Sequence, residues 1–394
     1  MTEQVQVAAD ALRGPQGYEN WQEALQGVPA RWGEEVQLYS DAHLTGEIVS
    51  GWGPYQALNT IAVEFHPACI PALVLRTTHH FAGDIPIPDM ENTDTSSYHG
   101  GGIADELSAL IGLALGIRLR PGGKTRDISF DPPYERPRAE DPASVPILTL
   151  RPGQRPLLPN MRKTVTVNES ILTGYPDLPP KAAVALVRAA RLFQHGLWLG
   201  ESNPNDAWLM FVSAAEVAAV HWRAAETNDD PEKLFRQVKP DWAARLDRAG
   251  DSALVHDMAG HWADLLGATN RFLKFLLAHL PEAPAERPTF SQVDWSRKGM
   301  RTELNQVYEW RSHALHAGIP FPAPMCDAPG VFGSENLTPV ERPIGLGAAS
   351  LGGVWRQEDM PMHLHLFVYI VRGALMNWWE CLKRGKGQEP PSSE

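Results

Sequence analysis

Arg311 and His316 lie five positions apart in the stretch from Val307 to Gly318, near the end of an apolar helical pattern. The Arg311 guanidinium is always charged and can hold a phosphate through two N–H donors at once. The His316 imidazole can take up or release a proton near neutral pH. Phosphate binding and proton transfer are together sufficient for cutting RNA without a metal ion.

The geometry of a helix sets a condition on this pair. An α-helix has 3.6 residues per turn, so two side chains five positions apart point about 140° away from each other. In a straight helix, Arg311 and His316 therefore do not share a face. Either the helix loosens near His313, or two copies of the stretch meet and complete one site together.

A structural role is the alternative for the same two residues. Cationic side chains are favourable at the C-terminus of a helix, where they interact with free carbonyl groups. An Arg–His pair at this spacing also arises readily by chance in a chain of 394 residues with 14 histidines. The spacing alone favours the structural role, so the argument for chemistry depends on the surrounding elements.

The elements that position this stretch are predicted to be mainly helical. The sequence pattern changes at Pro176-Asp-Leu-Pro-Pro180. After this segment, apolar residues recur mostly at helical spacing. The predicted helices cover residues 181–199, a segment that begins at Asn205, and residues 252–280, 295–317 and 362–383. A segment of roughly 45 residues precedes the last helix and is too long for a plain connector.

The first half of the chain is predicted to be mixed. Helices are expected over residues 105–117 and, more weakly, around Trp21 and Leu25, and residues 121–145 are expected to form a loop. Strand-like patterns cover residues 36–39, 60–65, 72–75, 145–149 and 164–167. We therefore predict an α+β chain with a mixed α/β domain over residues 1–178, a helical bundle over 179–384 and a disordered tail over 385–394.

The net charge, the cysteines and the distribution of apolar residues indicate which classes of protein fit this chain. The net charge of −12 argues against a general nucleic-acid binder, which is normally basic, but leaves room for a local basic pocket. Cys69, Cys326 and Cys381 form neither a zinc pattern nor a disulfide framework, which fits a reducing compartment. The sequence has no signal-peptide layout and no apolar run of about 18 residues. We therefore expect a cytoplasmic protein without a membrane partner, a metal or a cofactor.

Four pieces of the second half occur in a characteristic order. They are Arg188-Ala-Ala-Arg191-Leu-Phe, the stretch from Asp206 to Glu216, the stretch from Tyr308 to Gly318, and Tyr369-Ile-Val-Arg-Gly-Ala-Leu375. In this order they resemble the Apea-like group of the HEPN superfamily, whose motif is an arginine, a polar residue, three further residues and a histidine. The resemblance covers about residues 180–384, and residues 107–126 resemble more weakly the region often found ahead of such domains.

The resemblance implies a metal-independent endoribonuclease that acts as a dimer, with two motifs facing each other across the interface. Arg311 would bind the scissile phosphate, and His316 would be the general acid or base at the 2′-hydroxyl or the leaving oxygen. Ser312 would be the polar residue after the arginine, and Glu216 could orient Arg311 or His316. The family also implies an RNA substrate, a toxin or antiphage-defence role, and an inhibitory or activating protein partner.

Other residues carry weaker signals. Tyr98-His-Gly-Gly-Gly102 could bind an anion through free amide groups, or could simply be a flexible loop. His363-Leu-His365 could bind a metal but lacks partners at zinc spacing, which is typical of ordinary histidines. Glu216 lies in an apolar stretch, so it is expected either to be buried and paired or to face solvent. His313 either assists the neighbouring motif or lies on the other side of the helix.

A non-catalytic role is the alternative function. A HEPN-like bundle could serve dimerisation and partner binding, with Arg311 in a structural salt bridge, and the acidic balance of the chain favours this alternative slightly. An open, positive groove at a two-fold interface that holds Arg311 and His316 would favour the nuclease. A closed ion pair within one chain would favour the binding module.

Overall fold

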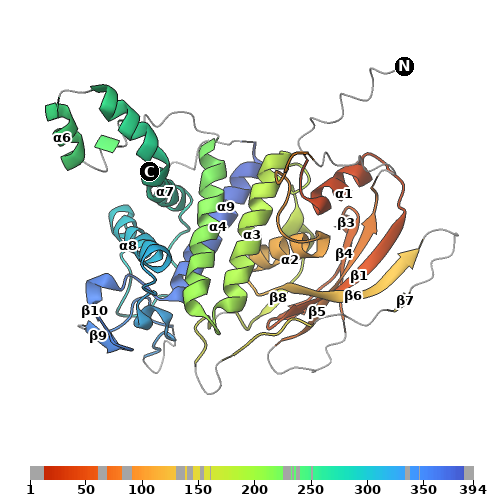
Figure 1. Cartoon of the computed structure of the whole chain (residues 1–394). Coiled ribbons are helices and arrows are strands. Elements are labelled where there is room, and N and C mark those ends of the chain that lie inside the picture. The colour runs from red at the N-terminus through yellow and green to blue at the C-terminus, as the bar shows by residue number, and fades with distance from the viewer. Residues whose placement is uncertain are drawn as a thin grey trace. The chain divides into compact units, whose positions relative to one another are not determined.

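The computed structural model describes residues 13–60, 69–81, 91–129, 138–139, 145–150, 155–159, 161–224, 232, 235–236, 240–249, 252–332, 338–345 and 347–385. The chain divides into two compact units, Met1–Met210 and Phe211–Glu394 (Figure 1). Helices and antiparallel strands both contribute, so the fold class is α+β as the sequence predicts. The units are taken in turn below.

An antiparallel sheet forms the framework of the first unit. Its strands in the described residues are, in spatial order, β3 (Ile48–Trp52), β4 (Tyr55–Leu58), β5 (Ile70–His79), β1 (Trp32–Ser40), β6 (Arg120–Ser129) and β7 (Arg138–Ala139). Leu73 and Leu75 on β5 are fully buried and alternate with more exposed residues. The sheet therefore has one apolar face that the helices of this unit can cover. A short parallel pair, β2 (His43–Thr45) with β8 (Thr164–Thr166), lies outside this sheet.

The described helices of the first unit include α1 (Gln16–Leu25), α2 (Ile103–Leu115) and α3 (Pro180–Leu199). The central helix α2 contacts α1, α3 and β6, which explains why it is apolar on nearly every side. Its start is capped by Asp105, whose carboxylate accepts a hydrogen bond from the Gly102 N–H at 3.1 Å. Its end is set by Gly116, whose left-handed backbone (φ 63°) suits glycine.

A buried carboxyl group joins α1 to α2. Glu106 is fully buried and accepts hydrogen bonds from the Gly17 N–H at 2.8 Å and the Tyr175 hydroxyl at 2.6 Å. The Nε2 atom of His99 lies 3.6 Å from the same carboxyl group. A Cβ atom at position 17 would come within 2.7 Å of Glu106 Oε1, so glycine is needed at this contact. Burial raises the pKa of Glu106 to about 7.

The second unit is mainly helical. Its elements are the part of α4 (Pro204–Ala224) that follows residue 210, then α6 (Pro240–Ala249), α7 (Ser252–Ala278), α8 (Arg297–His316) and α9 (Leu364–Lys383). Helix α7 contacts α6, α8 and α9. The core is rich in aromatic rings, with Phe275 and Trp378 packed edge to face at 5.9 Å.

The long segment between α8 and α9 is structured. It contains two short 3-10 helices, η2 (Ala323–Cys326) and η3 (Gln357–Asp359), and a hairpin of β9 (Gly347–Ser350) and β10 (Gly353–Arg356). Glu341 anchors it, because its buried carboxylate accepts two hydrogen bonds from Arg287, at 2.7 and 2.6 Å. The second unit therefore includes a small β element that the helical prediction did not contain.

Most predicted elements are confirmed, and two are wrong. All the predicted helices occur, with ends within a few residues of those expected. The loop prediction for residues 121–145 is wrong, because β6 extends to Ser129. The strand prediction for residues 145–149 is also wrong, since these residues form no regular element. Residues 61–65 of one predicted strand and residues 386–394 of the predicted tail lie outside the described residues.

The sequence predicts a domain boundary after residue 178. The two compact units of the structure divide instead between residues 210 and 211. The difference concerns α3, which packs against α2 in the first unit. In the described part of the chain, no helix is long and apolar enough to cross a membrane.

Candidate functional site

Helix α8 positions the central motif. It begins after Ser296, whose hydroxyl accepts a hydrogen bond from the Gly299 N–H at 3.1 Å. Met300, Leu304 and Val307 are fully buried at spacings of four and three residues, which fixes one face of α8 against the unit. The helix then runs without interruption through His316. The rotation of α8 about its axis, and hence the direction of the Arg311 side chain, is set by these contacts.

Arg311 is held by a carboxylate from α4. Its Nη2 atom lies 3.0 Å from Oε2 of Glu216, and both side chains are 21% exposed. The guanidinium carbon also lies 5.2 Å from the centroid of the Tyr308 ring, at cation–π distance. Glu216 is therefore paired and only partly buried, and it orients Arg311 as one of the predicted roles requires.

Tyr308 completes this cluster from one turn earlier on α8. Its hydroxyl donates a hydrogen bond of 2.8 Å to Oε1 of Glu216, so both carboxylate oxygens are engaged. Burial and the neighbouring Glu216 carboxylate raise the pKa of Tyr308 to about 12, which keeps the hydroxyl protonated as a donor. The ring packs on Phe272 of α7 at 5.1 Å. Glu216 is thus fixed from two sides, and it fixes Arg311 in turn.

The ion pair leaves much of the guanidinium available. A guanidinium has five N–H donors, and the bond to Glu216 comes from Nη2. Within the described residues, no other hydrogen bond from Arg311 is formed. An oriented guanidinium with unused donors and access to solvent is what a phosphate-binding arginine needs.

His316 and Ser312 are not brought to this cluster. His316 is exposed at the last helical position of α8, and Ser312 is partly exposed. Among the described residues, no hydrogen bond or ion pair joins either one to Arg311 or Glu216. Because α8 does not loosen near His313, the rotation of about 140° between Arg311 and His316 persists.

His313 lies on a different surface of the helix end. Its ring meets Trp310 edge to face at 5.4 Å. The Trp310 indole N–H donates to the Asp359 carbonyl oxygen at 2.8 Å, which ties the helix end to η3. This supports the expectation that His313 is a helix residue outside the motif.

The end of α8 exposes apolar side chains beside His316. Leu315 is 51% exposed and Ile319, just after the helix, is 50% exposed. Gly318, between α8 and Ile319, has a left-handed backbone (φ 65°) that ends the helix. Leu315 and Ile319 thus add exposed apolar surface beside His316.

The weaker candidates have structural explanations. The Gly102 amide donates to the Asp105 carboxylate at 3.1 Å, so this amide serves the start of α2 and does not bind an anion. His363 is buried and His365 is partly buried, and the loss of hydration lowers the pKa of the first to about 4 and of the second to about 3. In the part of the chain that the structure describes, no group of three or more His, Cys, Asp or Glu side chains could hold a metal ion.

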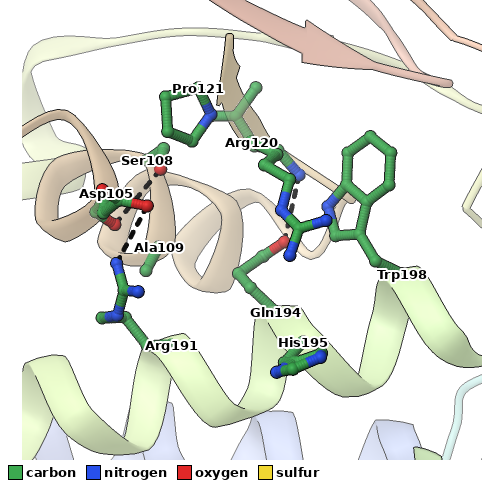
Figure 2. A pocket seen from close by; sticks show the side chains of 10 residues that line it. Asp105, Ser108, Ala109, Arg120, Pro121, Arg191, Gln194, His195 and Trp198 are labelled. Atoms are coloured by element: carbon green, nitrogen blue, oxygen red, sulfur yellow. Dashed lines mark hydrogen bonds and ion pairs between the residues drawn. The ribbon is translucent and has the colours of Figure 1, made fainter. Parts of the chain in front are cut away.

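The first unit contains a cavity that the sequence analysis did not predict. It lies between α2, β6 and α3 and has a volume of about 70 Å³ (Figure 2). Three basic side chains, Arg120, Arg191 and His195, line it. Arg191 and His195 are four positions apart on one helix and therefore share a face, a signal that the sequence does contain.

No family model matches the chain, and comparisons with curated proteins and with solved structures find no match either. The resemblance to HEPN proteins therefore rests on the sequence motifs alone.

Proposed function

We propose that the second unit is a metal-independent endoribonuclease of the HEPN type that cleaves RNA with Arg311 and His316. The observation that carries the proposal is the oriented guanidinium of Arg311. Glu216 forms an ion pair with one of its nitrogens, and the Tyr308 ring lies at cation–π distance from it. Tyr308 also donates a hydrogen bond to Glu216. This is the arrangement expected of an arginine that must bind a phosphate without being neutralised fully by its partner. In this proposal Glu216 is a positioning residue, and its ion pair with Arg311 supports that role.

The chemistry would be a transesterification. The 2′-oxygen attacks the adjacent phosphorus, the bond from phosphorus to the 5′-oxygen breaks, and a 2′,3′-cyclic phosphate and a 5′-hydroxyl form. One proton leaves the 2′-hydroxyl and one is delivered to the 5′-oxygen, and His316 would serve one of these transfers. Arg311 would stabilise the charge that builds on the phosphoryl oxygens. Ser312, next to Arg311, would add a polar contact to the substrate.

A second copy of the chain would complete the site. The uninterrupted helix keeps Arg311 and His316 about 140° apart, so one chain alone does not present both to one phosphate. The exposed Leu315 and Ile319 beside His316 would bury apolar surface in such a dimer. The proposed unit of activity is therefore a symmetric homodimer in which two motifs face each other.

The setting of this activity is part of the same proposal. Cys69, Cys326 and Cys381 are not joined in disulfides, which suits a cytoplasmic location, where RNA is available. A toxin or antiphage-defence effector, kept inactive by a protein partner until needed, is the biological role that such an activity would fit.

A non-catalytic binding module is the second candidate. The observation in its favour is that the Arg311–Glu216 ion pair forms within a single chain. In that case the pair would only hold α8 against α4, and the exposed residues at the end of α8 would bind a partner. The two candidates differ in whether Arg311 and His316 are needed for RNA cleavage.

RNA cleavage by purified full-length protein in the presence of EDTA tests the proposal. Arg311→Ala and His316→Ala should each lower cleavage of mixed cellular RNA at least a hundred-fold, the size of effect seen when an oxyanion donor is removed. Arg301→Ala, which removes an exposed arginine from the same helix, is the matched control and should cleave like the wild type. Equal cleavage by all four proteins, or none by the wild type, would favour the binding module.

A further inference from the structure

The small cavity of the first unit has the composition of an anion site (Figure 2). We propose that it binds a phosphate group, either inorganic phosphate or the phosphoryl end of a small phosphomonoester. This site lies in the first unit and does not rest on the proposed ribonuclease.

Two guanidinium groups reach the cavity from different elements. Arg120 comes from the first position of β6, and Arg191 comes from α3. Donors that arrive from two directions suit the spread oxygen atoms of a phosphate. Arg191 is already oriented, since it donates to the Gly100 carbonyl at 2.8 Å and lies 3.1 Å from the Asp105 carboxylate.

The cavity carries an excess of positive charge. Asp105 is the acidic residue that lines it, and it is paired with Arg191. Arg120 stacks on the Trp198 ring at 5.5 Å and has no carboxylate partner among the described residues. In a chain with a net charge of −12, an arginine beside a cavity without a carboxylate partner is a feature that an anionic ligand would explain.

His195 lines the cavity from an exposed position on α3. Partial burial lowers its pKa, and the nearby charges of Arg120 and then Arg191 lower it further, while Asp206 acts in the opposite direction. A bound phosphate would balance the two guanidinium groups. The neutral imidazole could then donate one further N–H to the ligand.

Trp198 adds a second independent observation. Its side chain lines the cavity and is 5% exposed, yet the indole Nε1 has no hydrogen-bond partner in the described residues. A buried N–H donor without a partner is costly, and a ligand or ordered water commonly satisfies it. The flanking Gln194 accepts a hydrogen bond from the Leu119 N–H and donates one to the Ile117 carbonyl, and it forms none with the indole.

The size of the cavity limits the ligand. On the scale used for its volume of about 70 Å³, one water needs roughly 10–15 Å³. The cavity therefore has room for roughly five atoms of that size, which suits one phosphate group. A whole nucleotide would need a pocket of about 300 Å³ or more, so any sugar or base would extend into solvent past the exposed Arg120.

Calorimetric titration of the full-length protein tests the site. The ligands are inorganic phosphate, adenosine 5′-monophosphate and, as a control anion, acetate at equal ionic strength. We expect binding of phosphate or the monophosphate and none of acetate. Tighter binding of the monophosphate would assign the site to a phosphomonoester, and equal or tighter binding of inorganic phosphate would assign it to the free ion.

Arg120→Gln should weaken phosphate binding about ten- to a hundred-fold, since it removes a charge-assisted donor. Arg162→Gln is the matched control, because Arg162 is exposed in the same unit and lines a different cavity. It should bind like the wild type. An equal loss in both variants, equal binding of acetate, or no binding of either phosphate ligand at millimolar concentration would overturn the proposal.

A second measurement uses only the wild type and so does not depend on the folding of a variant. Exposed Arg120 should react with phenylglyoxal, and mass spectrometry can follow the modification at that residue. Phosphate should slow the reaction at Arg120 and leave the reaction at Arg162 unchanged. Equal rates at Arg120 with and without phosphate would count against the site.

Discussion

The buried carboxyl group of Glu106 predicts a specific dependence of stability on pH. In the folded chain its pKa is raised from 4.5 to about 7, mainly by burial, so the group binds a proton more tightly in the folded than in the unfolded state. The tighter binding of this proton therefore stabilises the folded state fully below pH 4.5. This stabilisation decreases as the pH rises and is lost above about pH 7. The rise in pKa corresponds to about 3 kcal/mol at about 1.4 kcal/mol per pH unit.

Other groups titrate in the same range with the opposite sign. Burial lowers the pKa of His99, His279 and His363 to about 4 and that of His365 to about 3. The unfolded state binds these protons more tightly, so their contribution to stability grows as the pH rises from about 4 towards 6.5. The wild-type profile alone therefore does not isolate Glu106, and a variant is needed.

Urea unfolding of Glu106→Gln and the wild type between pH 5 and 8 isolates the effect. Gln cannot ionise, so the variant should gain about 2–3 kcal/mol relative to the wild type between pH 5 and 7, with no further gain above pH 7.5. Glu309→Gln removes an exposed carboxylate from α8 and should follow the wild type throughout. A difference between Glu106→Gln and the wild type that stays constant across the range would refute the reasoning.

Four substitutions in or next to α8 test its cap, its packing and the proposed dimer contact. Ser296→Ala removes the cap of α8 and should lower the free energy of unfolding by about 1 kcal/mol in urea titrations; an unchanged midpoint would contradict the capping bond. Leu304→Ala, at a fully buried position, should cost about 2–5 kcal/mol, whereas Leu315→Ala on the exposed surface should stay within about 0.5 kcal/mol, and equal costs would contradict the packing. Leu315→Glu should convert a dimer to monomer in sedimentation velocity with the fold retained, and an unaffected dimer would place the interface elsewhere.

The helices were predictable because their apolar periodicity is strong. In α8, the recurrence of Met300, Leu304 and Val307 fixes both the helix and its buried face. The start of β6 was not predictable in the same way. Arg120-Pro-Gly-Gly-Lys-Thr reads as a loop, and it becomes a strand because it pairs with β1. Long-range pairing of this kind overrides local preference.

The candidate site could be predicted only in part. The motif and the helix order offered Glu216 as a partner for either Arg311 or His316, and the structure pairs it with Arg311. The contribution of Tyr308 was not predicted, since it depends on how α8 is rotated against α4. The cavity lined by Arg120 and Arg191 joins positions far apart in the chain, and only the packing of α3 beside β6 reveals it.

The chemistry of the RNA ends is the most direct test of the central claim. Wild-type protein would be incubated with a defined single-stranded RNA in EDTA, and the product ends would be identified by mass spectrometry. We expect the wild type to produce 2′,3′-cyclic phosphate and 5′-hydroxyl ends. Arg311→Ala and His316→Ala should not produce these ends. Products with 5′-phosphate and 3′-hydroxyl ends, or identical products from the wild type and both variants, would contradict it.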